Sequence, residues 1–185
     1  MVQGLQCAVK PFPCTYLGLP LGLRKPTAAQ LQGVVDGAAR RLPIWGARLI
    51  NRGGRTALVK STLAAVPVHA MLSLDLPAKT LSDLTSLCRG FMWKGRKDVK
   101  GGHCLVAWNK VASPKECGGL GIPNLKILNL ALRCRWAWLK RTDPSKPWAS
   151  LNIQIPRESK AIFEAATTTI LGNGASALFW TDRWF

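Results

Sequence analysis

Apolar residues recur at helical spacing in several stretches of this chain, and prolines or capping residues bound most of these stretches. Thr27 and Asn124 are residue types that cap helix starts, and Pro77 suits a first helical turn. Pro43 and Pro67 should end or kink the helices that precede them. We therefore expect helices over about 27–42, 56–66, 77–92 and 124–139, with a weaker one over about 158–171.

Two short segments near the N-terminus, Leu5–Val9 and Thr15–Leu21, have extended character and flank a proline-rich turn. Proline confines such segments to an edge or a hairpin, and two strands alone are marginal in water. We expect a hairpin that needs a sheet from outside this chain. Leu105–Trp108 and Ala177–Phe185 also have strand character. The predicted fold is mainly α with a small β component: a helical bundle with an N-terminal β-hairpin and short C-terminal β segments.

Positive charge dominates the composition, with 26 Lys and Arg against 9 Asp and Glu and a net charge of +17. No acid precedes Asp36, and none lies between Asp36 and Asp75. So much like charge opposes compaction unless a polyanion relieves it. Nucleic acid is the expected partner, because phosphate binding releases counterions. An acidic membrane surface and a generic basic surface, as on small ribosomal or chromatin proteins, are the alternatives.

The acidic residues do not indicate a catalytic centre. Polymerase chemistry needs two or three carboxylates that converge on divalent metal ions, and no two of the acids here are adjacent or one residue apart. No nucleophile, base and acid stand at a recognisable spacing. The 6 cysteines form no CxxC pair, so buried thiols in a reducing compartment are expected rather than a zinc site. We predict no enzyme activity, no metal site and no cofactor for this chain.

Several groups of basic residues are candidates for phosphate contact. Arg52 and Arg55 flank two glycines at a helix start, where backbone N–H groups can bind phosphate. A simple inter-helix turn is the other interpretation of that segment. A dense basic loop adds Lys94, Arg96, Lys97 and Lys100. The fourth helix adds the heptad-spaced Lys126, Arg133 and Lys140, which lie near one face. That face could equally be a solvated one.

Short motifs follow one another in a fixed order along nearly the whole chain. They are Phe12-Pro13 to Leu21, Gly54–Ser61, Leu76-Pro77, Phe91–Gly95, Val106–Trp108, Pro114–Ile122, Pro147-Trp148, Gly172–Gly174 and Phe179–Trp184. In this order they resemble the region that follows the palm in plant non-LTR (LINE-type) retrotransposon reverse transcriptases. Each motif alone is weak, and the specificity of the resemblance lies in their order.

The resemblance implies a domain organisation. Residues 1–23 would be a residual palm hairpin that places Tyr16 and Gly18 near a primer grip, and residues 24–100 a helical thumb-like region that holds the template–primer duplex. Residues 101–143 would be a connection with a long helix, and residues 144–185 a linker toward a zinc-binding segment beyond this chain. The palm, with its Asp pair and Mg²⁺, would precede Met1.

The function expected from these observations is that of a truncated piece of such an RNA-directed DNA polymerase. It would grip an RNA/DNA template–primer duplex non-specifically and lack a catalytic centre, and the missing or separately encoded palm would be a second partner. A helical protein-interaction module and a non-functional retroelement remnant are the alternatives. We expect an intracellular, nuclear protein that is not secreted and does not contact a membrane. The predicted nucleic-acid contacts are Tyr16, Gly18, Arg48, Arg52, Arg55, Lys60, Lys94, Arg96, Lys97, Lys100, Lys126, Arg133 and Lys140.

Overall fold

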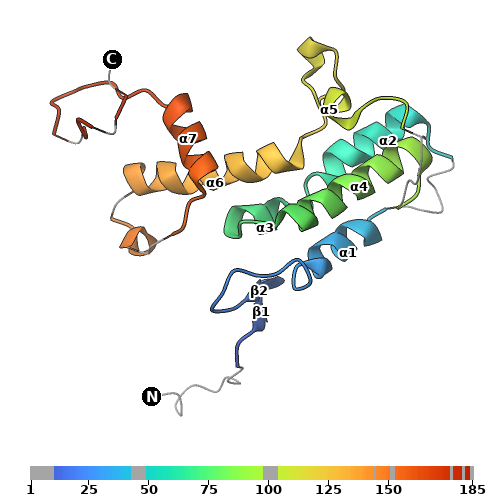
Figure 1. The fold of residues 1–185 in the computed structure, drawn as a ribbon, viewed down its shortest axis with the longest axis horizontal. Helices are drawn as coiled ribbons and strands as arrows, with labels where there is room; N and C mark the ends of the chain where they lie inside the picture. Colours follow the sequence, from blue (N-terminus) through green and yellow to red (C-terminus); the bar gives the residue numbers. More distant parts are fainter. Residues whose placement is uncertain are drawn as a thin grey trace. The chain divides into compact units, whose positions relative to one another are not determined.

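The computed structural model describes residues 11–42, 49–97, 104–143, 145–150, 153–175, 177–180, 182 and 183. Within these residues the chain is mainly helical, with a two-stranded antiparallel sheet near the N-terminus (Figure 1). The predicted mainly helical fold with an N-terminal hairpin is confirmed. The chain forms two compact units. Unit 1 consists of Met1–Ala70 and Leu76–Leu105, and unit 2 of Met71–Asp75 and Val106–Phe185.

A short hairpin of β1 (Cys14–Tyr16) and β2 (Leu19–Leu21) leads into unit 1. Its turn is Leu17-Gly18, and both residues have positive φ, 49° and 79°. Two-residue turns of this kind match the twist of the strands that they join. The hairpin differs from the predicted one, because Thr15–Leu21 is not a single strand but contains the turn. The other predicted strand, Leu5–Val9, lies outside the described residues.

Unit 1 is a small helical bundle. Its helices are α1 (Gln32–Arg40), α2 (Arg52–Leu58), the π-helix η1 (Val59–Leu63) and α4 (Ala78–Lys94), while α3 (Val68–Ser73) continues into unit 2. Thr27 and Gln30 form a capping box before α1: Thr27 N–H donates to Gln30 Oε1 at 2.9 Å, and Gln30 N–H to Thr27 Oγ1 at 3.4 Å. As predicted, the second helix is broken before Pro67, because η1 and a turn separate α2 from α3.

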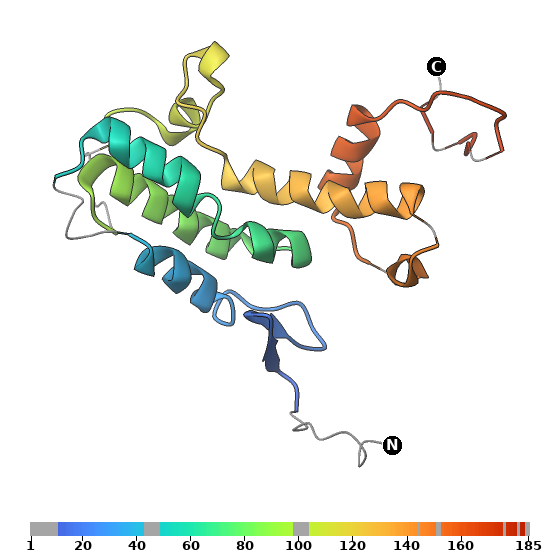
Figure 2. The same ribbon diagram turned by 180° about the vertical axis from the view of Figure 1, so that it is seen from behind.

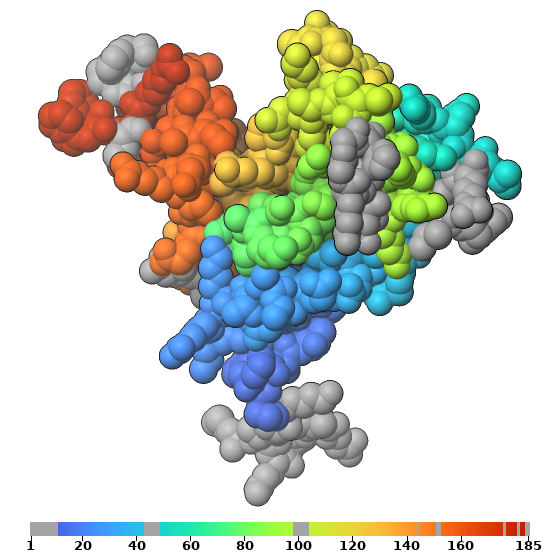
Figure 3. Space-filling view, turned by 45° about the vertical axis from the view of Figure 1, so that its right-hand side comes forward, coloured from blue at the N-terminus to red at the C-terminus, as the bar shows by residue number. Residues whose placement is uncertain are grey.

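The long helix α4 provides much of the core of unit 1. Pro77, predicted in the first turn of this helix, is the N-cap residue immediately before it. The predicted apolar face of α4 is buried as a whole: Leu81, Leu84, Leu87, Cys88, Phe91 and Met92. Helices α1 and α2 both pack against α4, and Figure 3 shows the blue surface of α1 directly against the green surface of this region. Each fully buried Leu or Phe contributes about 1.5–3 kcal/mol, so this face stabilises the bundle strongly.

The directions of the helices determine which termini meet. Helix α2 runs opposite to α4, whereas α1 runs in the same direction as α4 (Figures 1 and 2). The last turn of α1, the first turn of α2 and the last turn of α4 therefore lie toward the same end of unit 1. This end is the place where the sequence puts most of the exposed cations of that unit.

Unit 2 is organised around one long helix. Its elements are α5 (Trp108–Val111), the 3-10 helix η2 (Lys115–Cys117), α6 (Leu125–Thr142), the 3-10 helix η3 (Pro147–Ser150) and α7 (Arg157–Ala166). Asn124 caps α6 as predicted: its Oδ1 accepts from the N–H groups of Lys126 at 3.1 Å and Ile127 at 3.4 Å. Helix α7 packs against α6, where buried Ser159 donates to the carbonyl of Leu130 at 3.0 Å.

The other predicted β segments do not form strands among the described residues. In Leu105–Trp108, the carbonyl of Ala107 accepts from the N–H groups of Lys110 and Val111, so the chain turns into α5 instead of extending. The described residues between 177 and 183 form a turn closed by bonds between Leu178 and Asp182. In the described parts of the chain, no helix has the length and apolar character that crossing a membrane would need.

Candidate nucleic-acid interface

The two units differ in their charge balance. The described residues of unit 1 include twelve Lys and Arg but two acids, Asp36 and Asp83, whereas those of unit 2 include eleven Lys and Arg and six acids. Both acids of unit 1 already have partners: Asp83 pairs with Lys79 at 2.8 Å, and Asp36 accepts from the side-chain amide of Gln32 at 3.1 Å. The cationic surplus is therefore concentrated in unit 1, where a polyanion would relieve the most repulsion.

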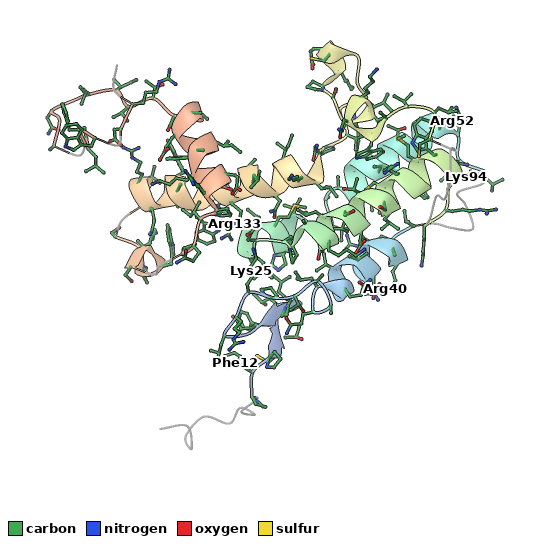
Figure 4. All side chains as sticks on the ribbon, viewed as in Figure 1. Phe12, Lys25, Arg40, Arg52, Lys94 and Arg133 are labelled. Carbon is green, nitrogen blue, oxygen red and sulfur yellow. The ribbon has the colours of Figure 1, made fainter. Side chains whose placement is uncertain are left out.

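Exposed cations gather where α1 and α4 end and α2 begins. Figure 4 shows Arg40, Arg52 and Lys94 toward this end, one from each of the three helices. Together with their exposed neighbours in sequence, the set is Arg40, Arg41, Arg52, Lys94, Arg96 and Lys97, which we call the basic end. None of these six forms an ion pair with another described residue. Their charge is thus available to an external anion.

Two cations of the basic end, Arg96 and Lys97, lie on a fixed turn after α4. Gly95 adopts φ 65°, and its N–H donates to the carbonyl of Phe91 at 2.8 Å. The N–H of Arg96 reaches back to the carbonyl of Gly90 at 3.4 Å. A Cβ on Gly90 would lie 2.7 Å from the carbonyl oxygen of Lys97, so a glycine is needed for this close approach. The cations also complement the negative end of the α4 dipole, which is a stabilising role independent of any ligand.

The start of α2 is a capped turn rather than an open phosphate loop. Asn51 Oδ1 accepts from the N–H of Gly54 at 2.8 Å and so occupies one of the free amide groups. A Cβ on Gly54 would lie 2.6 Å from Ile50 Cγ2, so close packing explains this glycine. Arg55 Nε donates to the carbonyl of Ile50 at 3.1 Å, and its side chain is half-buried. These contacts favour the inter-helix turn, and Arg52 is the exposed cation of the segment.

Arg133 does not face solvent, contrary to the prediction that it shares an accessible basic face with Lys126 and Lys140. It is 5% exposed, whereas the two lysines are exposed. Its guanidinium donates to the carbonyl of Ser73 at 3.3 Å and to that of Gln154 at 2.7 Å. The prediction from heptad spacing was wrong because the apolar face of α6 includes this position, where the guanidinium donates to main-chain carbonyls.

Arg133 belongs to a row of polar side chains on α6 that holds the Met71–Asp75 segment within unit 2. Asn129 donates to Asp75 Oδ1 at 3.3 Å, and the indole of Trp136 donates to the carbonyl of Leu72 at 2.9 Å. Burial lowers the pKa of Arg133, while the nearby Asp75 carboxylate opposes that shift. The role that the structure gives this row is structural, because its donors bond to Asp75 and to the carbonyls of Leu72, Ser73 and Gln154, although Asn129 Oδ1 and Arg133 Nε themselves have no described partner.

The remaining predicted contacts are scattered. Tyr16 is exposed on β1, Gly18 is in the hairpin turn, and Lys60 is half-buried on η1. Arg48 and Lys100 lie outside the described residues. Thus the structure brings Arg52, Lys94, Arg96 and Lys97 together in unit 1. Of the other predicted residues of that unit, Arg55 is half-buried in the first turn of α2, and Tyr16, Gly18 and Lys60 belong to other elements.

Arg40 and Arg41 are cations of the basic end that the sequence did not predict as contacts. Both are exposed, and Arg40 is in the last turn of α1. The signal that could have identified them is the absence of acids from 37 to 74 together with the expected helix end at Pro43. Their proximity to the start of α2 and the end of α4 depends on how the helices pack, which spacing alone does not reveal.

The described residues contain no group of three or more His, Cys, Asp or Glu side chains placed to hold a metal ion. Several acids have structural partners instead. Asp182 pairs with Arg141, and its carboxylate accepts from the N–H of Leu178 at 3.0 Å. These hydrogen bonds and the charge of Arg141 hold the pKa of Asp182 below its usual range, against the opposing effect of burial.

The chain is similar to an Arabidopsis thaliana protein named "Putative ribonuclease H protein", with 30% identity over 177 residues. The match takes in 82% of this chain and 28% of the Arabidopsis protein, so the chain spans less than a third of that relative's length. No protein-family model matches the chain. No solved structure matches it either.

Proposed function

We propose that this chain grips nucleic acid through phosphate contacts at the basic end, as the post-palm part of a LINE-type reverse transcriptase, and that it has no catalytic centre of its own. The observation that carries the proposal is the separation of charge. Unit 1 has twelve cations and two already partnered acids among its described residues, and six of these cations are exposed toward one end of the bundle.

The arrangement suits the phosphate backbone better than base edges. The cations lie at three separate helix ends, and two of them, Arg96 and Lys97, lie on a turn that Gly90 and Gly95 hold in place. Cations spread over a surface neutralise successive phosphates without reading sequence, and phosphate contacts supply most non-specific affinity. We therefore propose a template–primer duplex, bound without sequence preference, as the ligand.

Two further observations support a nucleic-acid partner. The ordered motifs from Phe12 to Trp184 resemble reverse transcriptases of plant retrotransposons, and the similar Arabidopsis protein has a name that refers to a nuclease. We propose gripping rather than cleavage for this chain, since acids such as Asp83 and Asp182 are engaged in ion pairs within the fold. Mg²⁺ would then belong to the palm, and the nucleus would be the place of action.

Salt dependence tests this proposal. If the six residues of the basic end each neutralise one phosphate, log K should fall with log salt with a slope of about −5. Affinity for a fluorescently labelled RNA–DNA duplex should then drop roughly a thousandfold between about 50 and 200 mM salt. Fluorescence anisotropy over that range measures the slope. A flat salt response, or no binding at the lowest salt, would overturn the proposal.

The exposed hairpin favours a second function, docking on a protein such as a separately encoded palm. Tyr16 is 63% exposed and Leu17 72% exposed, and a two-stranded sheet leaves strand edges unpaired. Replacing both residues with Ser should abolish co-purification with a protein partner after nuclease treatment. If the variant and the wild type retain the same partner, the hairpin is not the docking surface.

A further inference from the structure

The C-terminal part of unit 2 displays apolar side chains that the fold leaves uncovered. Trp180 is 91% exposed, Phe179 65% and Leu178 62%. The rings of Phe179 and Trp180 meet edge to face, with centroids 4.9 Å apart and an interplanar angle of 86°. We call Leu178, Phe179 and Trp180 the aromatic tip. An open hollow of about 190 Å³ adjoins it, lined by Leu171, Gly174, Ala177 and Phe179.

The aromatic tip is fixed at its base. The N–H of Leu178 donates to Asp182 Oδ2 at 3.0 Å, and the N–H of Asp182 donates to the carbonyl of Leu178 at 2.9 Å. The Asp182 carboxylate also pairs with Arg141 at the end of α6, and the N–H of Thr169 donates to the carbonyl of Arg183 at 2.7 Å. Because the turn is closed before any ligand arrives, binding to it has a small ordering cost.

The surroundings of the tip are cationic. Arg183 follows it directly and is exposed, and Arg141 connects it to the end of α6, where Lys140 is exposed as well. The adjacent acid, Asp182, is already neutralised by Arg141. An exposed indole with cations beside it matches a nucleobase and its flanking phosphates, because every base has a π-face and every nucleotide a negative charge. An uncharged apolar partner would gain nothing from these cations.

We propose that the aromatic tip is a stacking site for a base of single-stranded nucleic acid, with Trp180 as the platform and the cations near the end of α6 facing the flanking phosphates. The site is in unit 2, whereas the basic end is in unit 1. It therefore goes beyond the proposed phosphate grip and does not depend on it. It also gives a function to an exposed tryptophan that packing within the described residues does not explain.

Two oligomers of equal length and charge test the proposal: an oligothymidylate and the same sugar–phosphate chain without bases. Trp180→Ala in the full 185-residue chain should weaken binding of the oligothymidylate by about fivefold or more, the range that loss of one stacked base gives. It should leave binding of the abasic oligomer unchanged. Trp180→Phe, which keeps an aromatic face, should recover most of the lost affinity.

Matched variants distinguish this site from general effects. Trp138 is 53% exposed on α6 of the same unit, so Trp138→Ala removes a second exposed indole and should change the affinity for neither oligomer. The double variant Arg52→Gln/Lys94→Gln tests the basic end separately and should weaken both oligomers alike. Unchanged oligothymidylate binding in Trp180→Ala, or an equal loss for both oligomers, would overturn the stacking site without affecting the phosphate grip.

Discussion

Replacing Arg133 with Met should destabilise unit 2 rather than weaken nucleic-acid binding. Methionine replaces the aliphatic part of the arginine side chain but lacks the guanidinium and cannot donate hydrogen bonds. The variant would lose the bond to the carbonyl of Gln154 at 2.7 Å and the longer one to the carbonyl of Ser73 at 3.3 Å. Both carbonyls would lose the guanidinium as their donor.

The magnitude follows from these two bonds. A hydrogen bond from a charged donor contributes about 1.5–3 kcal/mol, and a long one is at the weak end, which gives about 3–4 kcal/mol for the pair. Removing a buried charge recovers part of this, because burial already disfavours the charged guanidinium, as its lowered pKa shows. We therefore expect the free energy of unfolding to fall by about 2–3 kcal/mol. The free energy of unfolding of Arg133→Lys should lie between those of the wild type and Arg133→Met, because an ammonium can donate hydrogen bonds but lacks the fork geometry of a guanidinium.

Urea unfolding combined with hydrogen exchange of α6 measures this loss within unit 2. The matched control is Arg135→Met, two residues further along the same helix, where the side chain is exposed. Its stability should stay within about 0.5 kcal/mol of the wild type. If Arg133→Met matched that control in stability but lowered nucleic-acid affinity, the guanidinium would be a ligand contact and the structural account would be refuted.

Three further predictions concern other parts of the chain. Gly90→Ala would bring a Cβ within 2.7 Å of a carbonyl oxygen in the turn after α4 and should lower the stability measured in a thermal melt by about 1–3 kcal/mol. Gly33→Ala, with open space around it, should raise the stability by up to about 1 kcal/mol, and equal melting shifts in the two variants would contradict this. Burial raises the pKa of Cys88 from 9.0 to about 12, so its contribution to stability holds below pH 9 and is lost as the pH rises toward 12. Alkylation and mass spectrometry at pH 8 should therefore modify exposed Cys117 and not Cys88, and equal labelling would show that Cys88 is accessible. The pKa of Asp182 is lowered below 3.8, so the contribution of this carboxylate is present above pH 3.8 and is lost as the pH falls through the folded value. Asp182→Asn should speed amide exchange in the aromatic tip at neutral pH, and unchanged exchange would mean that this carboxylate does not hold the turn.

Helix positions followed largely from local chemistry, which the sequence displays. Asn124 caps α6, Pro77 precedes α4, and the apolar face of α4 is buried as its periodicity predicted. Strands were harder to predict. The turn at Leu17-Gly18 requires positive φ at a leucine, which is an uncommon conformation for that residue and gives no sequence signal. Leu105–Trp108 has strand composition, but a strand needs a partner, and pairing is not visible in a short segment.

The sequence predicted the positive charge of the candidate site but not which residues belong to it. Net charge indicated a polyanion, and Lys94, Arg96 and Lys97 are exposed as a basic loop should be. Arg133 was misassigned because heptad spacing describes position around a helix and not which face the fold covers. The partition of acids between the units also depends on tertiary structure, since Met71–Asp75 joins residues that follow much later in the chain.

The most direct test of the central claim compares two sets of six charge-neutralising substitutions on duplex binding. One variant replaces the basic end with Gln, and the other replaces six exposed cations of unit 2: Lys110, Lys115, Lys126, Arg135, Lys146 and Arg157. Both lower the net charge equally. We predict that the basic-end variant loses nearly all of its salt dependence, so that the slope of log K against log salt changes by about 5. In the unit 2 variant the same slope should change by about 1 or less. Equal changes in the two variants would show that the charge acts over the whole surface, and the basic end would not be the grip.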